Sequence, residues 1–378
     1  MKEVRAKCGN LSVALSPAVR KWVSISAFLG FLAFLLYLYF FTDIIGVASV
    51  IGRTNLFVYS IVFLCVLASV AFNALAWQCL LESLKLKASY RLVFKLSWVG
   101  IFIDAIIPGG WSGDAFKAYL LSRDPNIDSG RTVASIVMKN VLELLIVMGI
   151  SFLGLFLLAT NYTLEGAVLI TVGVVLVLLT LPLIVIIYLS INFDATKRIL
   201  RRLKRFYAFV RRRPVNIEEF EKKMEEKLRE YHDGMVALKD NPKSLFQALF
   251  YHAVAWSFDI IALFLIFVSI GYIVPADKVI ITNVISVNLQ TQGVALAGFA
   301  QVVTSSVYTI LGISPILSAA STVLAGFASF WFKLVIAFFA FQLVVFSRCL
   351  PPFCIRLSGL RGKSSKDKTM LAQSTSDE

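Results

Sequence analysis

The sequence is poor in charged residues, which make up only 16% of its 378 positions, whereas 58% are hydrophobic. A soluble domain of this length could not bury so much apolar surface, so the composition excludes a purely soluble enzyme and an intrinsically disordered chain. Cysteine is also scarce: the five cysteines are odd in number and show no metal-site spacing, which argues against a disulfide framework. We therefore expect an integral membrane protein.

Catalytic motifs are missing as well. The sequence holds no DDxxD, HExxH, GxSxG or Walker A pattern, and no GxGxxG in a strand-helix context. Asp124 and Asp128 could together hold Mg²⁺ with a lipid diphosphate, although an ordinary turn is the better explanation of the two residues. The single sizeable polar segment, residues 192–244, is too short for a synthase or transferase domain. The missing motifs favour a protein without enzyme activity but leave the question open, and we expect no cofactor and no bound metal.

Acidic residues are few relative to basic ones, 23 against 37, which gives a net charge of +14. In a membrane protein this excess reports topology and contact with anionic lipid, and we expect no nucleic-acid partner. Of the basic residues, 33 lie in the segments 1–21, 82–95, 117–131, 194–243 and 348–368. Arg53 and Lys278 fall on the other side. The asymmetry predicts a multi-pass protein of the cell membrane with both termini in the cytoplasm.

Apolar runs long enough for a full span, about 20 residues, are frequent. They occur at residues 23–41, 57–81, 132–159, 167–189, 245–270 and 316–346. Two further apolar regions, residues 92–121 and 279–311, are interrupted by glycine-bearing polar sequence. The predicted fold is all-α and polytopic, with six full spans and two re-entrant or broken-helix hairpins.

The order of these elements repeats along the chain: two spans, a hairpin and a span, then the same again. Three full spans per half would place the second copy upside down, which is typical of inverted-repeat transporters. We predict repeats at residues 1–160 and 161–357, with a cytoplasmic insertion at 192–244 and a disordered tail at 358–378. The insertion should contain a basic amphipathic helix within 197–213 and a solvated helix within 218–233. Independent helices with coincidental spacing are the alternative.

The first interrupted region carries the most informative motif, a Pro-Gly-Gly turn at residues 108–110. Ser112 and Asp114 then suit the cap and first turn of a new helix. A helix N-terminus at membrane depth could bind a phosphate or carboxylate, and Lys117 would add a full charge. Alternatively, Asp114 satisfies the helix itself and pairs with Lys117, leaving a structural turn.

Other ionisable residues also fall within spans, where they are costly and mark polar pathways. Lys139 and Glu143 lie about 12 Å and about 18 Å beyond Arg131, and their spacing allows an ion pair or a substrate role. His252 and Asp259 share one face of the fifth span, as a proton relay or as interhelical hydrogen-bond partners. Lys333 has no acid within four residues and needs a partner on another helix or a ligand phosphate.

These motifs resemble the transmembrane region of lysylphosphatidylglycerol synthases. The family pattern of a polar residue, Pro, Gly followed by an acid, and a base corresponds to Asp104, Pro108, Gly113, Asp114 and Lys117. Aspartate and lysine replace the usual glutamate and arginine. In the third span Lys139-Asn140 stands where the family has a base-acid pair, and Glu143 keeps an acid nearby.

The second hairpin matches the family less closely, since Gly298 agrees but Gln301 replaces an acid and the proline is missing. The resemblance implies a flippase-like membrane protein that moves or handles polar-headed lipids, without the synthase domain that some relatives carry. The candidate substrate-binding residues are Asp104, Pro108, Gly109, Gly110, Gly113, Asp114, Lys117, Lys139, Glu143, Gln301 and Lys333.

Two other functions remain open from the sequence. An integral-membrane transferase could act on a lipid-linked substrate with Asp104, Asp114 or Asp124 and Asp128 as base or metal ligands. A non-catalytic partner of a cell-envelope enzyme is the third possibility. The leading hypothesis is translocation of an anionic phospholipid or a polyprenyl-phosphate-linked lipid.

Overall fold

The computed structural model describes residues 43–107, 111–124, 127–161, 188, 217–289 and 299–349. Helices joined by short turns make up this part of the chain, which contains no strand. Its principal helices are α3 (Ile44–Gly52), α4 (Leu56–Ser83), α5 (Tyr90–Ile106), α6 (Ser112–Leu121), α7 (Ser129–Asn161), α10 (Ile217–Lys239), α11 (Pro242–Ser269), α12 (Ala276–Leu289), α13 (Phe299–Ile310), α14 (Pro315–Gly326) and α15 (Phe332–Cys349). The all-α fold class is thus confirmed for the described residues.

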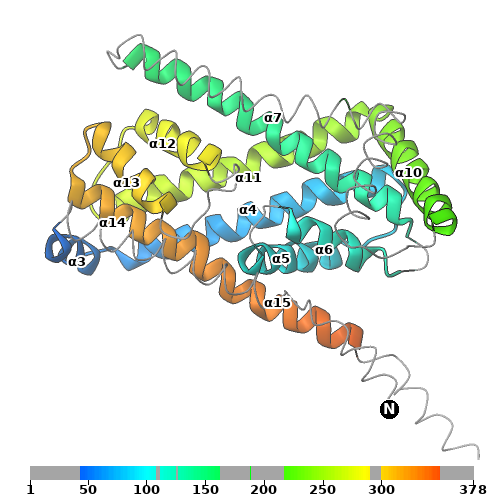
Figure 1. Ribbon diagram of the computed structural model, residues 1–378. Helices are drawn as coiled ribbons and strands as arrows, with labels where there is room; N and C mark the ends of the chain where they lie inside the picture. Colours follow the sequence, from blue (N-terminus) through cyan, green and yellow to red (C-terminus); the bar gives the residue numbers. More distant parts are fainter. Residues whose placement is uncertain are drawn as a thin grey trace, which may run out of the picture.

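An antiparallel pair of long helices, α4 and α11, forms the centre of the bundle (Figure 1). An asparagine ties the pair together at each end. The backbone N–H of Asn55 donates to the carbonyl of Ser269 at 2.7 Å, and Asn241 Nδ2 donates to Ser83 Oγ at 3.1 Å. Asn55 also caps α4, because its Oδ1 accepts from the backbone of Phe57. These polar ends set the register of two otherwise apolar helices.

Four helical stretches among the described residues are long and apolar enough to cross a membrane. They are Leu56–Ser83, Ser129–Asn161, Pro242–Ser269 and Pro315–Val344. They correspond to the predicted spans 57–81, 132–159, 245–270 and 316–346. The predicted spans 23–41 and 167–189 lie outside the described residues, apart from residue 188.

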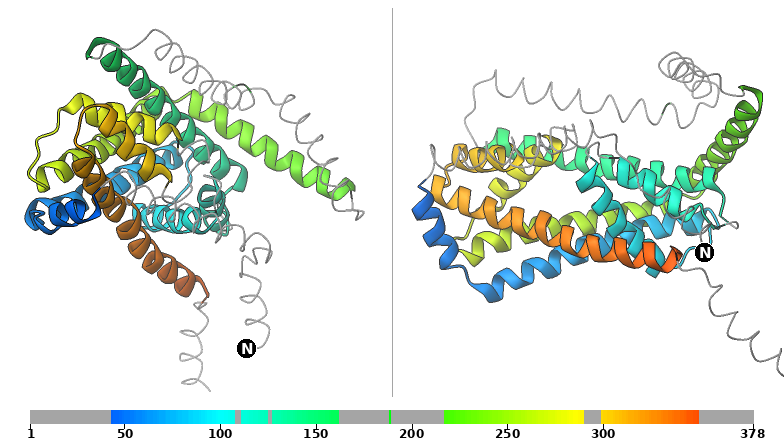
Figure 2. Two further views of the ribbon diagram at one scale, coloured as in Figure 1. Left: turned by 60° about the vertical axis from the view of Figure 1, so that its left-hand side comes forward. Right: turned by 60° about the horizontal axis from the view of Figure 1, so that its bottom comes forward.

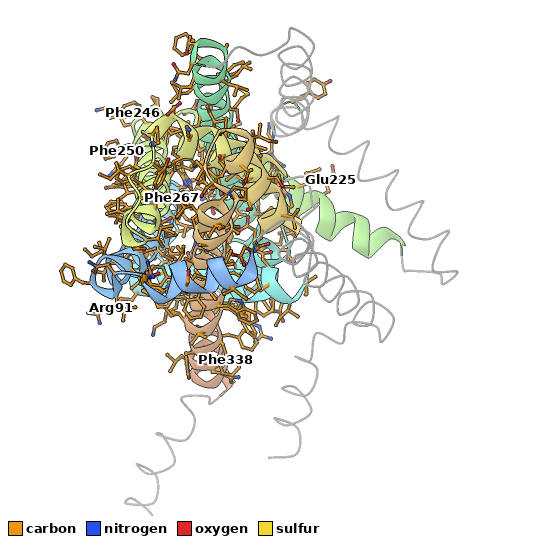
Figure 3. All side chains as sticks on the ribbon, turned by 90° about the vertical axis from the view of Figure 1, so that its left-hand side faces the viewer. Arg91, Glu225, Phe246, Phe250, Phe267 and Phe338 are labelled. Carbon is orange, nitrogen blue, oxygen red and sulfur yellow. The ribbon has the colours of Figure 1, made fainter. Side chains whose placement is uncertain are left out.

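Large apolar side chains cover the outside of these helices, as expected of a surface that faces lipid. Figure 3 shows Phe246 and Phe250 on α11 and Phe338 on α15 at the outside of the bundle. Phe246 is 73% exposed and Phe339, the neighbour of Phe338, is 60% exposed. The chain is therefore an integral membrane protein with several apolar helices.

Each interrupted region forms two helices that pack against each other. Residues 92–121 divide into α5 and α6, and residues 279–311 divide into α12 and α13. The α5–α6 pair lies at the end of the bundle that also holds α10, whereas α12 and α13 lie at the opposite end, as does α3 (Figures 1 and 2). The prediction that neither region is one continuous helix is thus confirmed.

The last predicted span is not one regular helix. A π-helical turn, Phe327–Trp331, joins α14 to α15. Just before it, the carbonyl of Leu324 accepts a 2.9 Å hydrogen bond from the buried hydroxyl of Tyr59 on α4. π-Helical turns occur frequently at functional sites. Lys333 follows this turn by two positions.

The predicted helix within 218–233 is α10, and it is packed against α7 rather than solvated on all sides. Glu230 of α10 accepts from the backbone N–H of Gly130 at 3.0 Å. Gly234 faces Ala134 one turn further along α7. The predicted basic helix within 197–213 lies outside the described residues.

Candidate functional site

The N-terminus of α6 is capped by a carboxylate from another helix. Asp104 Oδ1, near the end of α5, accepts from Ser112 Oγ at 2.8 Å and from the backbone N–H of Gly113 at 2.7 Å. The predicted cap at Ser112 is wrong, because Ser112 already lies inside the helix and Trp111 precedes it without a side-chain bond. Asp104 thus occupies part of the predicted anion site. Pro108, Gly109 and Gly110 lie outside the described residues.

Two glycines let α5 and α6 approach closely. A Cβ added to Gly113 would collide with the carbonyl oxygen of Gly100 and with Asp104. A Cβ on Gly100 would lie 2.9 Å from Cδ of Lys117, so the aliphatic part of that lysine rests directly on Gly100. The ammonium of Lys117 lies 5.4 Å from the ring centroid of Trp77 on α4, within range of a cation–π contact. The close approach of α5 and α6 at these two glycines therefore places Lys117 inside the bundle.

Asp114 is the centre of a buried group of charges where α6 meets α7. It forms an ion pair with Lys117, accepts from Asn140 Nδ2 at 2.7 Å, and lies 3.6 Å from Lys139 Nζ. Asp114 and Lys117 are each 8% exposed. The competing expectation, that Lys117 pairs with Asp114, is confirmed. Burial of such a pair is tolerated only with further hydrogen bonds, which Asn140 supplies.

Lys139 connects this group to Glu143. Its Nζ lies 3.4 Å from Glu143 Oε2 and 3.1 Å from Asn140 Oδ1. The predicted i,i+4 ion pair is thus present. The side chain of Lys139 is 12% exposed, but that of Glu143 is 53% exposed, although it lies about 21 Å along α7 from Ser129. An acid that is open to its surroundings at this depth must face polar groups or water, because lipid tails cannot solvate it.

We refer to Asp104, Asp114, Lys117, Lys139, Asn140 and Glu143 as the charge cluster. It contains three carboxylates and two ammonium groups, so its formal charge is −1. The two lysines are the groups that could bind a phosphate, and each now pairs with a carboxylate. A phosphate would therefore enter by exchanging with one of these carboxylates.

A second row of polar side chains links α4 and α11. His252 Nδ1 lies 2.8 Å from Asn73 Oδ1, and Ser69 Oγ donates to Asp259 Oδ2 at 2.9 Å. Asp259 also interacts with the charge of Lys333 on α15. Lys333 therefore lies within electrostatic range of an acid on another helix. The expected interhelical contacts of His252 and Asp259 are present.

The remaining candidates lie apart from the cluster. Gln301 is on α13 at the other end of the bundle, where its amide lies 3.6 Å from the Cβ position of Gly326. Asp124 and Asp128 belong to the turn between α6 and α7: the carbonyl of Asp124 accepts from Ile127, and Asp128 lies 3.7 Å from Arg131. Among the described residues, no group of three His, Cys, Asp or Glu side chains could hold a metal ion.

Sequence reasoning missed the neutral residues that hold the charges in place. Gly100, Trp77 and Asn73 are ordinary members of apolar helices, and no spacing rule singles them out. Their roles depend on contacts between helices far apart in sequence. Asn73, a lone amide within a predicted span, was the one detectable signal, because buried amides in membranes find interhelical partners.

The chain is similar to known membrane proteins over most of its length. The family model described as the lysylphosphatidylglycerol synthase TM region matches residues 24–337. A UPF0104 membrane protein of Methanocaldococcus jannaschii is 26% identical over 287 residues, which cover 74% of this chain and 82% of the relative. A UPF0104 membrane protein of Pyrococcus horikoshii is 23% identical over 271 residues, covering 70% of this chain and 80% of the relative.

Proposed function

Because this chain belongs to the family of the lysylphosphatidylglycerol synthase transmembrane region, we propose that it carries phosphate-bearing lipids between the leaflets of the cell membrane. The substrate would be an anionic phospholipid or a polyprenyl-phosphate-linked lipid. The headgroup passes through the bundle while the acyl or prenyl chains stay in the bilayer. The lipid phosphate is the group that the protein recognises.

The observation that carries this proposal is the pair of buried lysines in the charge cluster. Lys117 and Lys139 both approach Asp114, and keeping such charges inside a membrane protein is costly. The pairs of Lys139, at 3.6 Å and 3.4 Å, are longer than a charge-assisted hydrogen bond of about 2.8 Å. Lys139 also donates to Asn140 Oδ1 at 3.1 Å, so its ammonium is shared among three oxygens, and in the proposed mechanism it transfers from a carboxylate to a lipid phosphate.

Two further features support a path for the headgroup. Glu143 is half exposed and gives the cluster an opening toward its surroundings. Lys333 and Asp259 are two further charged residues, and Lys333 lies next to the π-helical turn of the last span.

The proposed architecture is an inverted repeat, with halves at residues 1–160 and 161–357. The placement of α5 and α6 at one end and of α12 and α13 at the other supports it (Figure 1). We place the α10 end, the insertion at 192–244 and both termini in the cytoplasm, because the basic residues gather on that side. The hairpins would then enter from opposite leaflets and gate the headgroup in turn.

The experiment measures leaflet exchange of fluorescent phosphatidylglycerol in vesicles that contain the purified protein. Lys117→Ala and Lys333→Ala should each slow exchange by about tenfold or more, the effect of losing roughly 1.4 kcal/mol of phosphate binding. Lys117→Arg should retain more activity, since it keeps the charge. Lys243→Ala, at an exposed position at the start of α11, is the matched control and should exchange lipid normally.

Exchange at the wild-type rate by both alanine variants would refute the role of these lysines. A loss of inserted protein would instead assign them to folding. Conversion of the probe to a product of different mass, without exchange, would favour a membrane-embedded transferase.

A further inference from the structure

His252 is a buried base whose second ring nitrogen is unoccupied. It lies on α11, is 3% exposed, and Nδ1 contacts Asn73 Oδ1 at 2.8 Å. An amide oxygen can only accept a hydrogen bond, so Nδ1 carries the hydrogen. Nε2 then holds a free lone pair, and it has no hydrogen-bond partner in the described part of the chain. The contact with Asn73 thus fixes the ring so that Nε2 is the atom that can take up a proton.

His252 lies on α11, which packs against α7, the helix that carries Lys139 and Glu143. The charged groups that act on His252 are Glu143 and Lys139 of α7 and Lys117 of α6. The neutral Asn73 comes from α4. A proton on Nε2 would attract Glu143 and repel both lysines. Protonation of His252 is therefore coupled electrostatically to the residues that would bind a phosphate.

The net charge of the cluster explains why a proton on His252 would assist phosphate binding. With three carboxylates and two ammonium groups, the cluster carries a formal charge of −1 before a ligand arrives. A phosphodiester would add another negative charge in a medium of low dielectric constant, which is unfavourable without a compensating cation. His252 is the neutral base placed to supply that cation.

We propose that His252 is a proton-binding site that couples proton movement to the movement of a lipid phosphate. The proposal rests on the function proposed above. A hydronium ion supplies the proton, so one O–H bond breaks as the N–H bond forms on Nε2. The imidazolium then holds Glu143, and Lys139 is released to bind the phosphate.

The direction of coupling follows from linkage. If protonation of His252 favours phosphate binding, phosphate binding favours protonation by the same factor. Lipid and proton therefore occupy the protein together and cross in the same direction. A pH difference of one unit should shift the leaflet distribution of a one-proton lipid by about tenfold, toward the leaflet on the less acidic side.

The test uses the full chain in vesicles with fluorescent phosphatidylglycerol and an imposed pH difference. Wild type should enrich the probe in the leaflet at higher pH. His252→Gln keeps an amide donor for Asn73 but cannot take up a proton, so exchange should continue without enrichment. The chain has two histidines, and His232→Gln, on α10, is the matched control that should behave like wild type.

The outcomes separate the two proposals. An absence of exchange by wild type at any pH difference refutes the transport function and this inference with it. Exchange that ignores the pH difference, or enrichment toward the acidic side, refutes the inference alone. Normal enrichment by His252→Gln would overturn the role of His252 as the proton-binding site. The transported proton would then belong to another residue, with Glu143 the first candidate.

A second measurement covers the case in which His252→Gln fails to insert. In His232→Gln the remaining histidine is His252, and its ring can be observed by NMR with labelled histidine. Addition of dioctanoyl phosphatidylglycerol at constant pH should shift the ring signals toward the protonated form. Signals that stay unchanged while the lipid binds would refute the proposal.

Discussion

Gly113 is the residue at which α6 comes closest to α5. A methyl group there would meet the carbonyl oxygen of Gly100, which is part of the α5 backbone, and the carboxylate of Asp104, which caps α6. We expect Gly113→Ala to destabilise the hairpin by about 1–3 kcal/mol, the usual cost of overpacking. Binding of fluorescent phosphatidylglycerol to the purified variant should fall as the cluster is displaced.

The matched control for Gly113→Ala is Gly149→Ala on α7, where a Cβ would meet nothing within 4 Å. This variant should bind lipid normally and melt at the same or a slightly higher temperature, because alanine favours helix over glycine. Equal stability and equal lipid binding in both variants would show that the close α5–α6 contact does not support the site.

The sequence predicted contacts within one helix but not those between helices. The spacings Asp114 to Lys117 and Lys139 to Glu143 place each pair on one helical face, and both ion pairs are present. The bond from Asn140 to Asp114 joins residues 26 positions apart on different helices. Such a contact depends on how α6 and α7 pack, which local spacing cannot reveal. The cap at Ser112 failed for the same reason, since Asp104 reaches the helix end from α5.

At the scale of the element, α10 is attached to the membrane bundle through glycine. A Cβ on Gly130 would lie 2.6 Å from the carbonyl oxygen of Lys227 and 2.8 Å from the nitrogen of Tyr231. Glu230 both accepts from Gly130 and pairs with Lys227 at 2.7 Å. This hydrogen bond raises the pKa of Lys227 above its ordinary value. The contact therefore combines close backbone packing with a local ion pair.

We predict that Gly130→Ala loosens α10 without unfolding the membrane spans. The added methyl should weaken the α7–α10 contact by about 1–3 kcal/mol, because the obstructing atoms belong to the backbone of α10. Limited trypsin digestion checks this, since α10 is rich in lysine and arginine and should be cut faster in the variant. Gly149→Ala, on the same helix α7, should be cut like wild type. Unchanged cleavage in Gly130→Ala would mean that α10 is held by contacts elsewhere.

The helices themselves followed from composition more directly than their packing did. Long apolar runs predicted α4, α7 and α11 nearly to their ends. A backbone in lipid must satisfy its own hydrogen bonds, and a helix does so within a single segment. The Pro-Gly-Gly interruption likewise predicted the division of residues 92–121 into two helices. The π-helical turn after α14 was not predicted, since Phe327–Trp331 is as apolar as its surroundings. Near this turn the hydroxyl of Tyr59 on α4 donates to the carbonyl of Leu324, a contact between distant helices that local sequence does not reveal.

At the scale of the whole molecule, basic residues distinguish the two ends of the bundle. Among the described residues, the turn before α5 and the α10 end carry most of the lysines and arginines, whereas Arg53 and Lys278 lie at the end with α3, α12 and α13. Lysine and arginine near the ends of spans remain in the cytoplasm. We therefore predict that the α10 end faces the cytoplasm and that the opposite end faces outward.

Single cysteines placed at the two ends of the bundle test this orientation on intact cells. In a variant with the native cysteines replaced by alanine, Ile273→Cys, which is 80% exposed between α11 and α12, should react with an impermeant maleimide. Asp240→Cys, at the exposed end of α10, should react only after the cells are opened. Reaction of both on intact cells would place both ends outside and refute the topology. The reverse pattern would turn the protein over, so that the α5–α6 hairpin would receive lipid from the outer leaflet first.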